Sequence, residues 1–464
     1  MDSVTDTPEN IEELSRINPI RLAWGITLIA FAVFCLIFVT SVLGVHYFFF
    51  QSSRSLEATL YVGRGTVGVK TPNGVEQAET DERALSSGTI VRTDQTDLLS
   101  QAVITLRDPN YDNSLVASIT LMGGSSVRLR STSRPRFRWS STNYHGVLEA
   151  SGKMDVLIAD GLNHDVQIII YISTGAEVRL ETSGRYGIDV SDTLVRVMSY
   201  RGQAILVAAN RLNTQSISEG QQGELNLQSD VIELAPTLVN LVTNSDLLPF
   251  ESTTPGEAGN TPTGLIGWSC TNTPPNNLPT GDYRAELSPD GRPSLRFVRA
   301  GGADTNGRTI CEQHFDGGLD VRGYSYLSIR AVVYIHYQSL NRCGTRGSEC
   351  PLMVKIQYID ENYAANHQEG EEPPYWIQGI YVRDDPGSDY PLRCDSCLSN
   401  NIRIYDDVWY IYQSDNLFTL YLPERRPITI TDVIFYTEGH QYDVFIDEVA
   451  LLAGQILPGA SDGN

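Results

Sequence analysis

The chain has 464 residues, which at roughly 100–200 residues per domain leaves room for about two or three globular units. It carries 34 Lys and Arg against 56 Asp and Glu, a formal net charge of −22. This acidic balance argues against nucleic-acid binding and suits a region that is soluble outside the cytoplasm.

The first element expected along the chain is a membrane-spanning helix. Residues 22–45 include no charged side chain, and at about 1.5 Å per helical residue they span roughly 36 Å, enough for a hydrocarbon core of about 30 Å. The aromatic run Tyr47 to Phe50 follows, as in a belt at the membrane interface. A cleaved signal peptide, whose apolar region would be about 7–15 residues, is the alternative. We expect an uncleaved helix over 22–50, behind a short cytoplasmic tail over 1–21.

The cysteines indicate the compartment. Of seven, Cys35 lies in the apolar segment and the other six fall in the C-terminal half. An even set beside an export anchor predicts three disulfides in an oxidising compartment. Among the 15 possible connectivities we favour Cys270–Cys311, Cys343–Cys350 and Cys394–Cys397. Zinc is the alternative for Cys394 and Cys397, although no second pair of that spacing accompanies them. We therefore expect a cell-membrane protein with a cytoplasmic N-terminus and its bulk extracellular or periplasmic.

Residues 55–235 alternate apolar and polar side chains in short segments that glycines separate. A period of two with closely spaced turn residues predicts an all-β domain. Within it, Arg134, Arg136 and Arg138 project to one face if the segment is extended, and can engage phosphate or carboxylate groups of lipids, envelope polymers or a partner. The alternative is an edge strand protected by charge, with which Pro135 is consistent.

After a Pro- and Gly-rich stretch, the β pattern resumes with aromatic alternation that suits a two-sheet sandwich. We assign 236–456 to this disulfide-bonded sandwich and 457–464 to a flexible tail. The expected fold class is thus an all-β region of two domains with one N-terminal transmembrane helix.

The first domain resembles the FecR-type domain of bacterial envelope proteins. The resemblance rests on the succession of segments 65–69 (GTVGV), 85–94 (LSSGTIVRTD), 117–129 (ASITLMGGSSVRL), 184–190 (GRYGIDV), 198–207 (MSYRGQAILV) and 217–225 (ISEGQQGEL). Signalling members of the family join an extracytoplasmic signal to a cytoplasmic anti-sigma segment. About 21 residues precede the helix here, which are too few to bury a core, so an envelope interaction unit is the better expectation.

The second domain resembles a carbohydrate-binding-module-like or galactose-binding-like jelly roll. Residues 244–251 (NSDLLPFE) with Trp268 are similar to the opening strand of such a module, and 442–452 (YDVFIDEVALL) to its closing strand. Some members hold a structural calcium near these strand ends. The resemblance implies Glu251 and Asp447 as its carboxylates, and no other cofactor is expected.

Aromatic residues of the second domain are candidate ligand contacts. Trp376 and Trp409, with Tyr375 and Tyr410, can form a stacking platform for sugar rings. The alternative is that they fill the sandwich core, since Trp409 and Tyr410 must face opposite sides of one strand.

No catalytic constellation stands out, because the GxSxG elbow, the HExxH zinc helix and the P-loop are all missing from the sequence. We expect a membrane-anchored extracytoplasmic binding protein, not an enzyme, with an envelope glycan or another surface protein as its partner. A transmembrane signal regulator of the FecR type, acting on a sigma factor, is the alternative from another class. A surface glycan hydrolase is the third.

Overall fold

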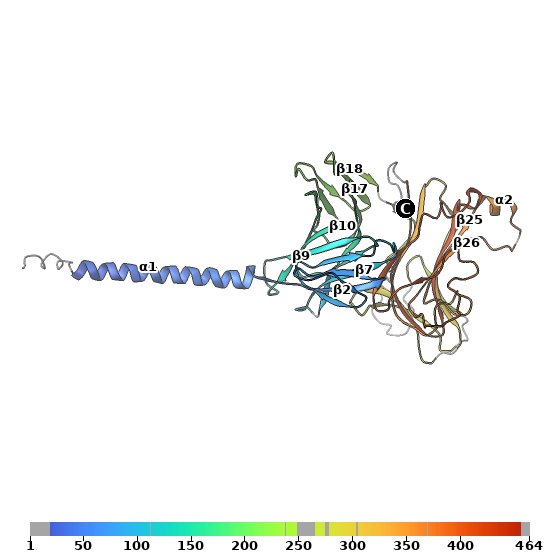
Figure 1. The fold of residues 1–464 in the computed structure, drawn as a ribbon, viewed down its shortest axis with the longest axis horizontal. Coiled ribbons are helices and arrows are strands. Elements are labelled where there is room, and N and C mark those ends of the chain that lie inside the picture. The colour runs from blue at the N-terminus through green and yellow to red at the C-terminus, as the bar shows by residue number, and fades with distance from the viewer. Residues whose placement is uncertain are drawn as a thin grey trace, which may run out of the picture. The chain divides into compact units, whose positions relative to one another are not determined.

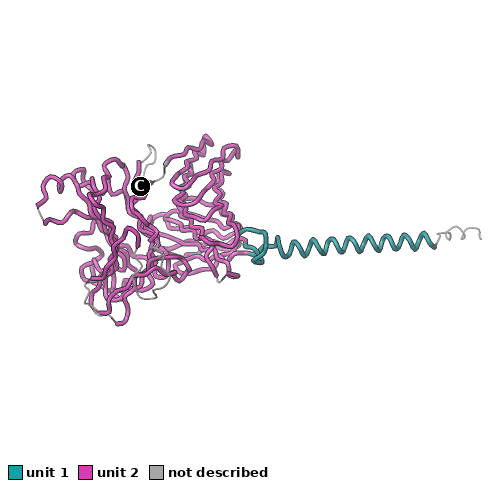
Figure 2. The backbone as a smooth tube through the Cα atoms, turned by 180° about the vertical axis from the view of Figure 1, so that it is seen from behind, with its two compact units in different colours: residues 1–54, 134–143 teal, residues 55–133, 144–464 magenta. Residues whose placement is uncertain are grey.

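The computed structural model describes residues 19–111, 113–236, 238–247, 265–273, 278–302, 305–368 and 370–455. The chain divides into two units, shown in Figure 2: residues 1–54 with 134–143, and residues 55–133 with 144–464.

The first unit contains the apolar helix α1 (Pro19–His46), which continues into the π-helix η1 (Tyr47–Gln51) (Figure 1). The span 20–51 is the one helix of the described residues that is long and apolar enough to cross a membrane. A two-residue strand, β1 (Ser53–Arg54), follows and pairs with Pro135 and Arg134 at the end of β9. An N-terminal apolar helix is therefore present where the sequence predicts it.

The N-terminal β region of the second unit contains two sheets with one strand in common. The first has the order β5-β2-β7-β8-β10-β13-β14-β17-β18, with all neighbours antiparallel. The second has the order β4-β3-β6-β9-β10-β11-β12-β15-β16, in which only β10 and β11 are parallel. The strands are β2 (Glu57–Arg64), β3 (Val67–Lys70), β4 (Gln77–Glu79), β5 (Arg83–Leu85), β6 (Ile90–Thr93), β7 (Gln101–Asp108), β8 (Ser114–Leu121), β9 (Ser126–Pro135), β10 (Tyr144–Ile158), β11 (Val166–Tyr171), β12 (Glu177–Leu180), β13 (Gly184–Val190), β14 (Leu194–Arg201), β15 (Ala204–Val207), β16 (Thr214–Ile217), β17 (Gln221–Asn226) and β18 (Val231–Pro236).

The long strand β10 belongs to both sheets because it changes partners halfway along. Residues 145–151 pair with β9, and residues 152–158 pair with β13. Gly152 stands at the change with φ +84°, and a Cβ there would lie 2.7 Å from Cα of Ser125. This position therefore needs a glycine both for its backbone conformation and for the close approach of the neighbouring chain.

The C-terminal β-sandwich has two antiparallel sheets that pack face to face. Sheet D has the order β21-β22-β30-β24-β28, with β19 also on β30. Sheet F has the order β20-β23-β29-β25-β26-β27, and only β26 and β27 are parallel. The elements are β19 (Val239–Asn240), β20 (Ser269–Thr273), β21 (Asp282–Leu287), β22 (Pro293–Arg299), β23 (Gly307–Asp320), β24 (Tyr326–Gln338), β25 (Leu352–Ile359), α2 (Glu361–Asn366), β26 (Tyr375–Tyr381), β27 (Ile402–Arg403), β28 (Trp409–Gln413), η2 (Pro423–Arg425), β29 (Thr429–Gly439) and β30 (Tyr442–Gly454).

The disulfides join the six cysteines of this sandwich in the favoured pairs: Cys270–Cys311, Cys343–Cys350 and Cys394–Cys397. The first links facing residues of β20 and β23. Cys35 in α1 is the free cysteine. The mostly-β fold with one N-terminal apolar helix confirms the expected fold class, whereas the expected domain boundaries stay predictions.

Candidate functional site

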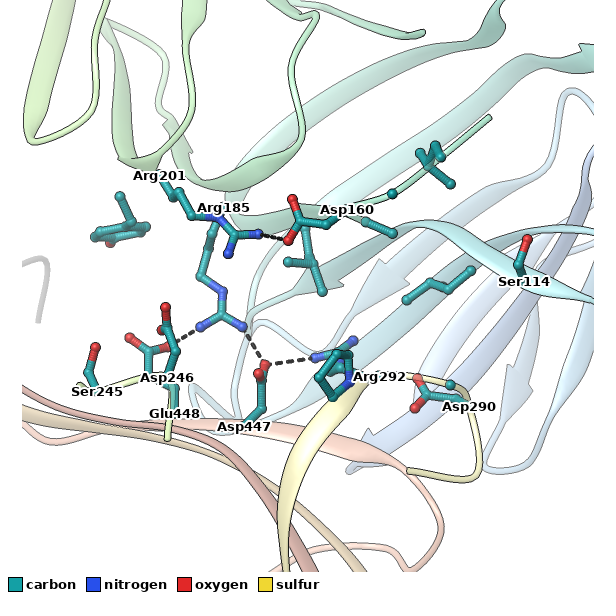
Figure 3. A pocket seen from close by; sticks show the side chains of 18 of the residues that line it. Ser114, Asp160, Arg185, Arg201, Ser245, Asp246, Asp290, Arg292, Asp447 and Glu448 are labelled. Atoms are coloured by element: carbon teal, nitrogen blue, oxygen red, sulfur yellow. Dashed lines mark hydrogen bonds and ion pairs between the residues drawn. The ribbon is translucent and has the colours of Figure 1, made fainter. Parts of the chain in front are cut away.

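A cleft of about 1260 Å³ lies in the second unit. The N-terminal β region contributes Tyr111 and residues 113–115, 159–163 and 219–220, and the sandwich contributes residues 238–240, 245–246, 289–293 and the middle of β30. Figure 3 shows that charged side chains from both sides point toward one another here.

The floor of the cleft is a buried ion-pair network. Arg185 of β13 reaches across to Asp447 and Glu448 of β30, and Arg292 lies 3.4 Å from Asp447 (Figure 3). Burial alone would raise the pKa of Asp447, but Arg185 and Arg292 outweigh it and hold that pKa below its usual range. A carboxylate held ionised in this way is a poor proton acceptor, so the floor is suited to holding structure and not to acid–base chemistry.

A second buried arginine extends the network beneath the cleft. Arg330 of β24 lies 2.7 Å from Asp155 of β10 and 2.9 Å from Glu448. Its guanidinium also lies 5.5 Å from the ring centre of Tyr200, which lines the cleft. The network therefore joins β10 and β13 of the N-terminal β region to β24 and β30 of the sandwich.

The rim of the cleft offers polar groups to a ligand. Among the described residues Asp246 has no hydrogen-bond or ion-pair partner, and burial, with Glu448 and Asp447 nearby, raises its pKa although Arg185 opposes the shift. Arg201 pairs with Asp160 at the opposite side (Figure 3). A carboxylate and guanidinium groups around one space can hydrogen-bond a ligand that carries several hydroxyl groups.

Of the two expected calcium carboxylates, the structure describes Asp447 alone, so the calcium site stays a prediction. Asp447 is taken up by two arginines, whose positive charges oppose a cation at that position. Glu251 lies outside the described residues. Within those residues no group of three or more His, Cys, Asp or Glu is placed to hold a metal ion.

Three of the four expected platform residues are buried. Trp376 is 3 % exposed and Tyr410 is 0 % exposed, and both belong to the sandwich core. Trp409 is 5 % exposed and packs on the other face of sheet D beside Tyr334. This arrangement is the alternative in which the aromatic side chains fill the core. A strand that is covered on both faces exposes the rings of neither face.

Tyr375 is partly exposed and lines a smaller groove of about 350 Å³ on the outer face of sheet F. Lys355 Nζ lies 4.2 Å from its ring centre, so the ring face already has a cation partner. Arg308 and Arg346 also line this groove. It is a second, smaller place on the sandwich where a ligand can bind.

The expected anion patch belongs to the first unit and not to the cleft. Arg134 is buried and pairs through its backbone with Arg54 of β1 at the end of β9. Arg136 is half-buried over Phe48, and Arg138 is exposed.

Sequence reasoning missed the buried arginines of the cleft. Arg330 stands in the otherwise apolar segment LSIRAVVYI, and Arg185 stands within GRYGIDV. A charged residue among apolar neighbours in a strand signals a buried partner, since an unpaired buried charge is too costly to keep. That signal does not say which carboxylate the arginine meets.

Fold and site thus define a mostly-β protein with an N-terminal apolar helix and a charged cleft. No family model and no curated protein matches the chain. Among solved structures, a protein from Parabacteroides distasonis assigned as an anti-sigma factor is 13% identical, over 32% of this chain and 59% of that chain, with a TM-score of 0.23.

Two carbohydrate-binding modules are similar at the same level. The family 11 module of Clostridium thermocellum is 10% identical over 42% of this chain and 92% of its own length, with a TM-score of 0.24. The CBM22-1 xylan-binding domain of Paenibacillus barcinonensis Xyn10C is 12% identical over 48% and 99%, also with a TM-score of 0.24. Similarities of this size assign neither a family nor a function.

Proposed function

We propose that this chain is a single-pass membrane protein whose β-rich unit lies outside the cytoplasm and binds a hydroxyl-rich ligand, a glycan, in the charged cleft. One observation carries the proposal: Asp246 lacks a partner among the described residues and lies in a cleft whose floor charges are already paired. Asp246 can therefore accept hydrogen bonds from a ligand. The charged side chains of the floor neutralise one another and need no ligand to do so.

The size and polarity of the cleft support a glycan. Small-molecule pockets commonly measure about 300–1,000 Å³, so a cleft of about 1260 Å³ has room for an extended ligand. Its tyrosines, among them Tyr111 and Tyr200, add partly apolar surface beside the charged groups. The first binding hypothesis, stacking on Trp376 and Trp409, is replaced by hydrogen bonding in the cleft.

Binding is tested with the full chain in detergent or nanodiscs on an array of neutral and acidic oligosaccharides, followed by calorimetric titration of the strongest binder. Asp246→Asn should weaken binding about 10- to 100-fold, since a hydrogen bond to a charged group is worth about 1.5–3 kcal/mol. Asp192→Asn, at an exposed turn, is the matched control and should bind normally.

A third variant separates the cleft from the groove on sheet F. Tyr375→Ala should leave affinity unchanged if the cleft is the site. If that variant loses binding while Asp246→Asn does not, the cleft is wrong and the groove is right. An array without any signal from the folded chain would contradict glycan binding altogether.

Anchoring is tested separately. The full-length chain should fractionate with membranes, and protease added to spheroplasts should remove the β-rich unit. The oxidised cysteines support this topology, because disulfides persist in oxidising compartments. Recovery of a soluble, shortened chain would contradict the anchor. The alternative of sigma-factor regulation through residues 1–21 stays a prediction, since those residues lie almost wholly outside the described ones.

A further inference from the structure

The loop between β9 and β10 folds onto the C-terminal end of the apolar helix. Residues 134–143 belong to the same unit as α1 and η1. Ser140 Oγ donates a hydrogen bond to the carbonyl oxygen of Phe50 at 2.7 Å, and the backbone N–H of Ser141 donates to the same oxygen at 2.8 Å. The β1 ladder continues the attachment through Ser53 and Pro135. This loop is therefore fixed to the helix end by hydrogen bonds to its backbone.

Aromatic rings make up the contact itself. The ring of Phe137 lies 5.6 Å from that of Phe48 and 5.3 Å from that of Phe49, centre to centre. Trp139 stacks on Phe137 at 5.4 Å with an interplanar angle of 5°. Yet Trp139 is still 60 % exposed, and Phe48 and Phe49 are about two-fifths exposed. The loop and helix end thus present a cluster of large aromatic surface that the chain leaves open.

In the first unit, the charged side chains of the described residues are all basic. Its described part, residues 19–54 and 134–143, contains no Asp or Glu, although the whole chain carries −22. The arginines of this described part are Arg21, Arg54, Arg134, Arg136 and Arg138. Arg136 lies 4.3 Å from the ring centre of Phe48, so cation and ring face share one surface. This part of an otherwise acidic protein has no carboxylate among its described residues, so its surface is complementary to anions.

We propose that the loop 134–143 is a membrane-surface contact, in which Trp139 and the exposed phenylalanines enter the interface while Arg136 and Arg138 bind the phosphates of anionic phospholipids. The inference rests on the proposed membrane anchor. The span 20–51 has 32 residues, about 48 Å of helix, so its last turn reaches the headgroup region of a bilayer about 40–45 Å thick in total. Aromatic rings with arginines beside them are the composition that this region favours.

The test uses the full chain in nanodiscs of phosphatidylcholine, with or without phosphatidylglycerol. In a Cys35→Ala background, Trp139→Cys carries the environment-sensitive fluorophore NBD, and Asn143→Cys provides a second label site that leaves the Phe137 stack intact. Leu212→Cys, at an exposed turn of the N-terminal β region, is the control. Labels at 139 and 143 should be blue-shifted and quenched by brominated phospholipid, whereas the label at 212 should report water.

Charge removal identifies the phosphate contribution. In discs with phosphatidylglycerol, Arg136→Gln with Arg138→Gln should lower the ratio of lipid-contacting to water-exposed label about 30-fold, since each arginine near an anionic surface contributes about fivefold. Arg211→Gln, an exposed arginine of the N-terminal β region, removes one charge elsewhere and should leave the ratio unchanged.

The outcomes separate this inference from the anchor on which it rests. Incorporated chains whose labels at 139 and 143 are as water-exposed as the label at 212 would overturn the membrane contact and leave the anchor intact. If the labels are shielded from water but not quenched by brominated phospholipid, and cross-linking yields dimers, the surface contacts a second copy of the chain. That result would also overturn the membrane contact. A chain that does not incorporate at all would overturn the anchor first.

Discussion

Replacing Arg330 by methionine should destabilise the second unit by about 3–5 kcal/mol. The arginine is 3 % exposed and lies between Asp155 and Glu448, which are also buried. Methionine fills a similar volume but leaves Asp155 without its partner and Glu448 with Arg185 alone. Removing one member of a buried ion pair costs about that much because a buried charge stays uncompensated.

The measurement is urea unfolding of the full chain followed by tryptophan fluorescence, with the free energy taken from linear extrapolation. Arg322→Met is the matched control, because Arg322 forms an exposed pair with Asp320 at 2.7 Å and such pairs are worth about 0–1 kcal/mol. The double variant Asp155→Asn with Arg330→Met should recover at least about 1 kcal/mol, since one of the uncompensated charges is then gone.

Two results would refute this reasoning. A loss below about 1 kcal/mol for Arg330→Met, equal to that of the control, would mean that the pair is solvated and not buried. A double variant no more stable than the single one would mean that the methionine disturbs packing and that charge is not the cause.

The remaining predictions concern backbone, disulfide and pH. Gly152→Ala should cost more than Gly161→Ala, because both have positive φ but only at 152 would the new Cβ meet a backbone atom; unfolding free energies should differ by at least about 1 kcal/mol. Cys270→Ala with Cys311→Ala should cost about 4 kcal/mol in the same assay, from the loop entropy of a separation of 41 residues. Because the folded-state pKa of Asp447 lies below its unfolded value, its stabilisation is present above about pH 4 and is lost as pH falls further; Asp447→Asn should remove that part of the acid dependence.

Local patterns predicted the fold class and the disulfide pairs. Composition predicts the apolar helix, because a bilayer requires an apolar segment of a minimum length. Alternation of side chains along the segment predicts the strands. In VWYIYQ, for example, Trp409 and Tyr410 do face opposite sides of the strand. The short disulfides followed from sequence neighbours such as Cys394 and Cys397, which are close before folding.

The cleft could not be predicted, because it depends on pairs that are remote in sequence. Arg185 meets Glu448 across 263 positions, and nothing local to either residue names the other. The expected stacking platform for sugar rings was also limited by contacts that are remote in sequence. Alternation places Trp409 on one face of β28, but it does not say that side chains such as Tyr334 and Phe445 share that face and help bury the ring.

The paired floor limits what the cleft can bind. A cationic ligand group placed beside Asp447 would compete with Arg185 and Arg292, whose geometry already satisfies that carboxylate. An anionic group would meet Asp246 and Glu448 and lose its own hydration. Neutral hydroxyl groups carry neither penalty, because each can accept from a guanidinium and donate to a carboxylate at once. Under the proposed function, the same network that joins the N-terminal β region to the sandwich would therefore favour an uncharged, hydroxyl-rich ligand over either ion.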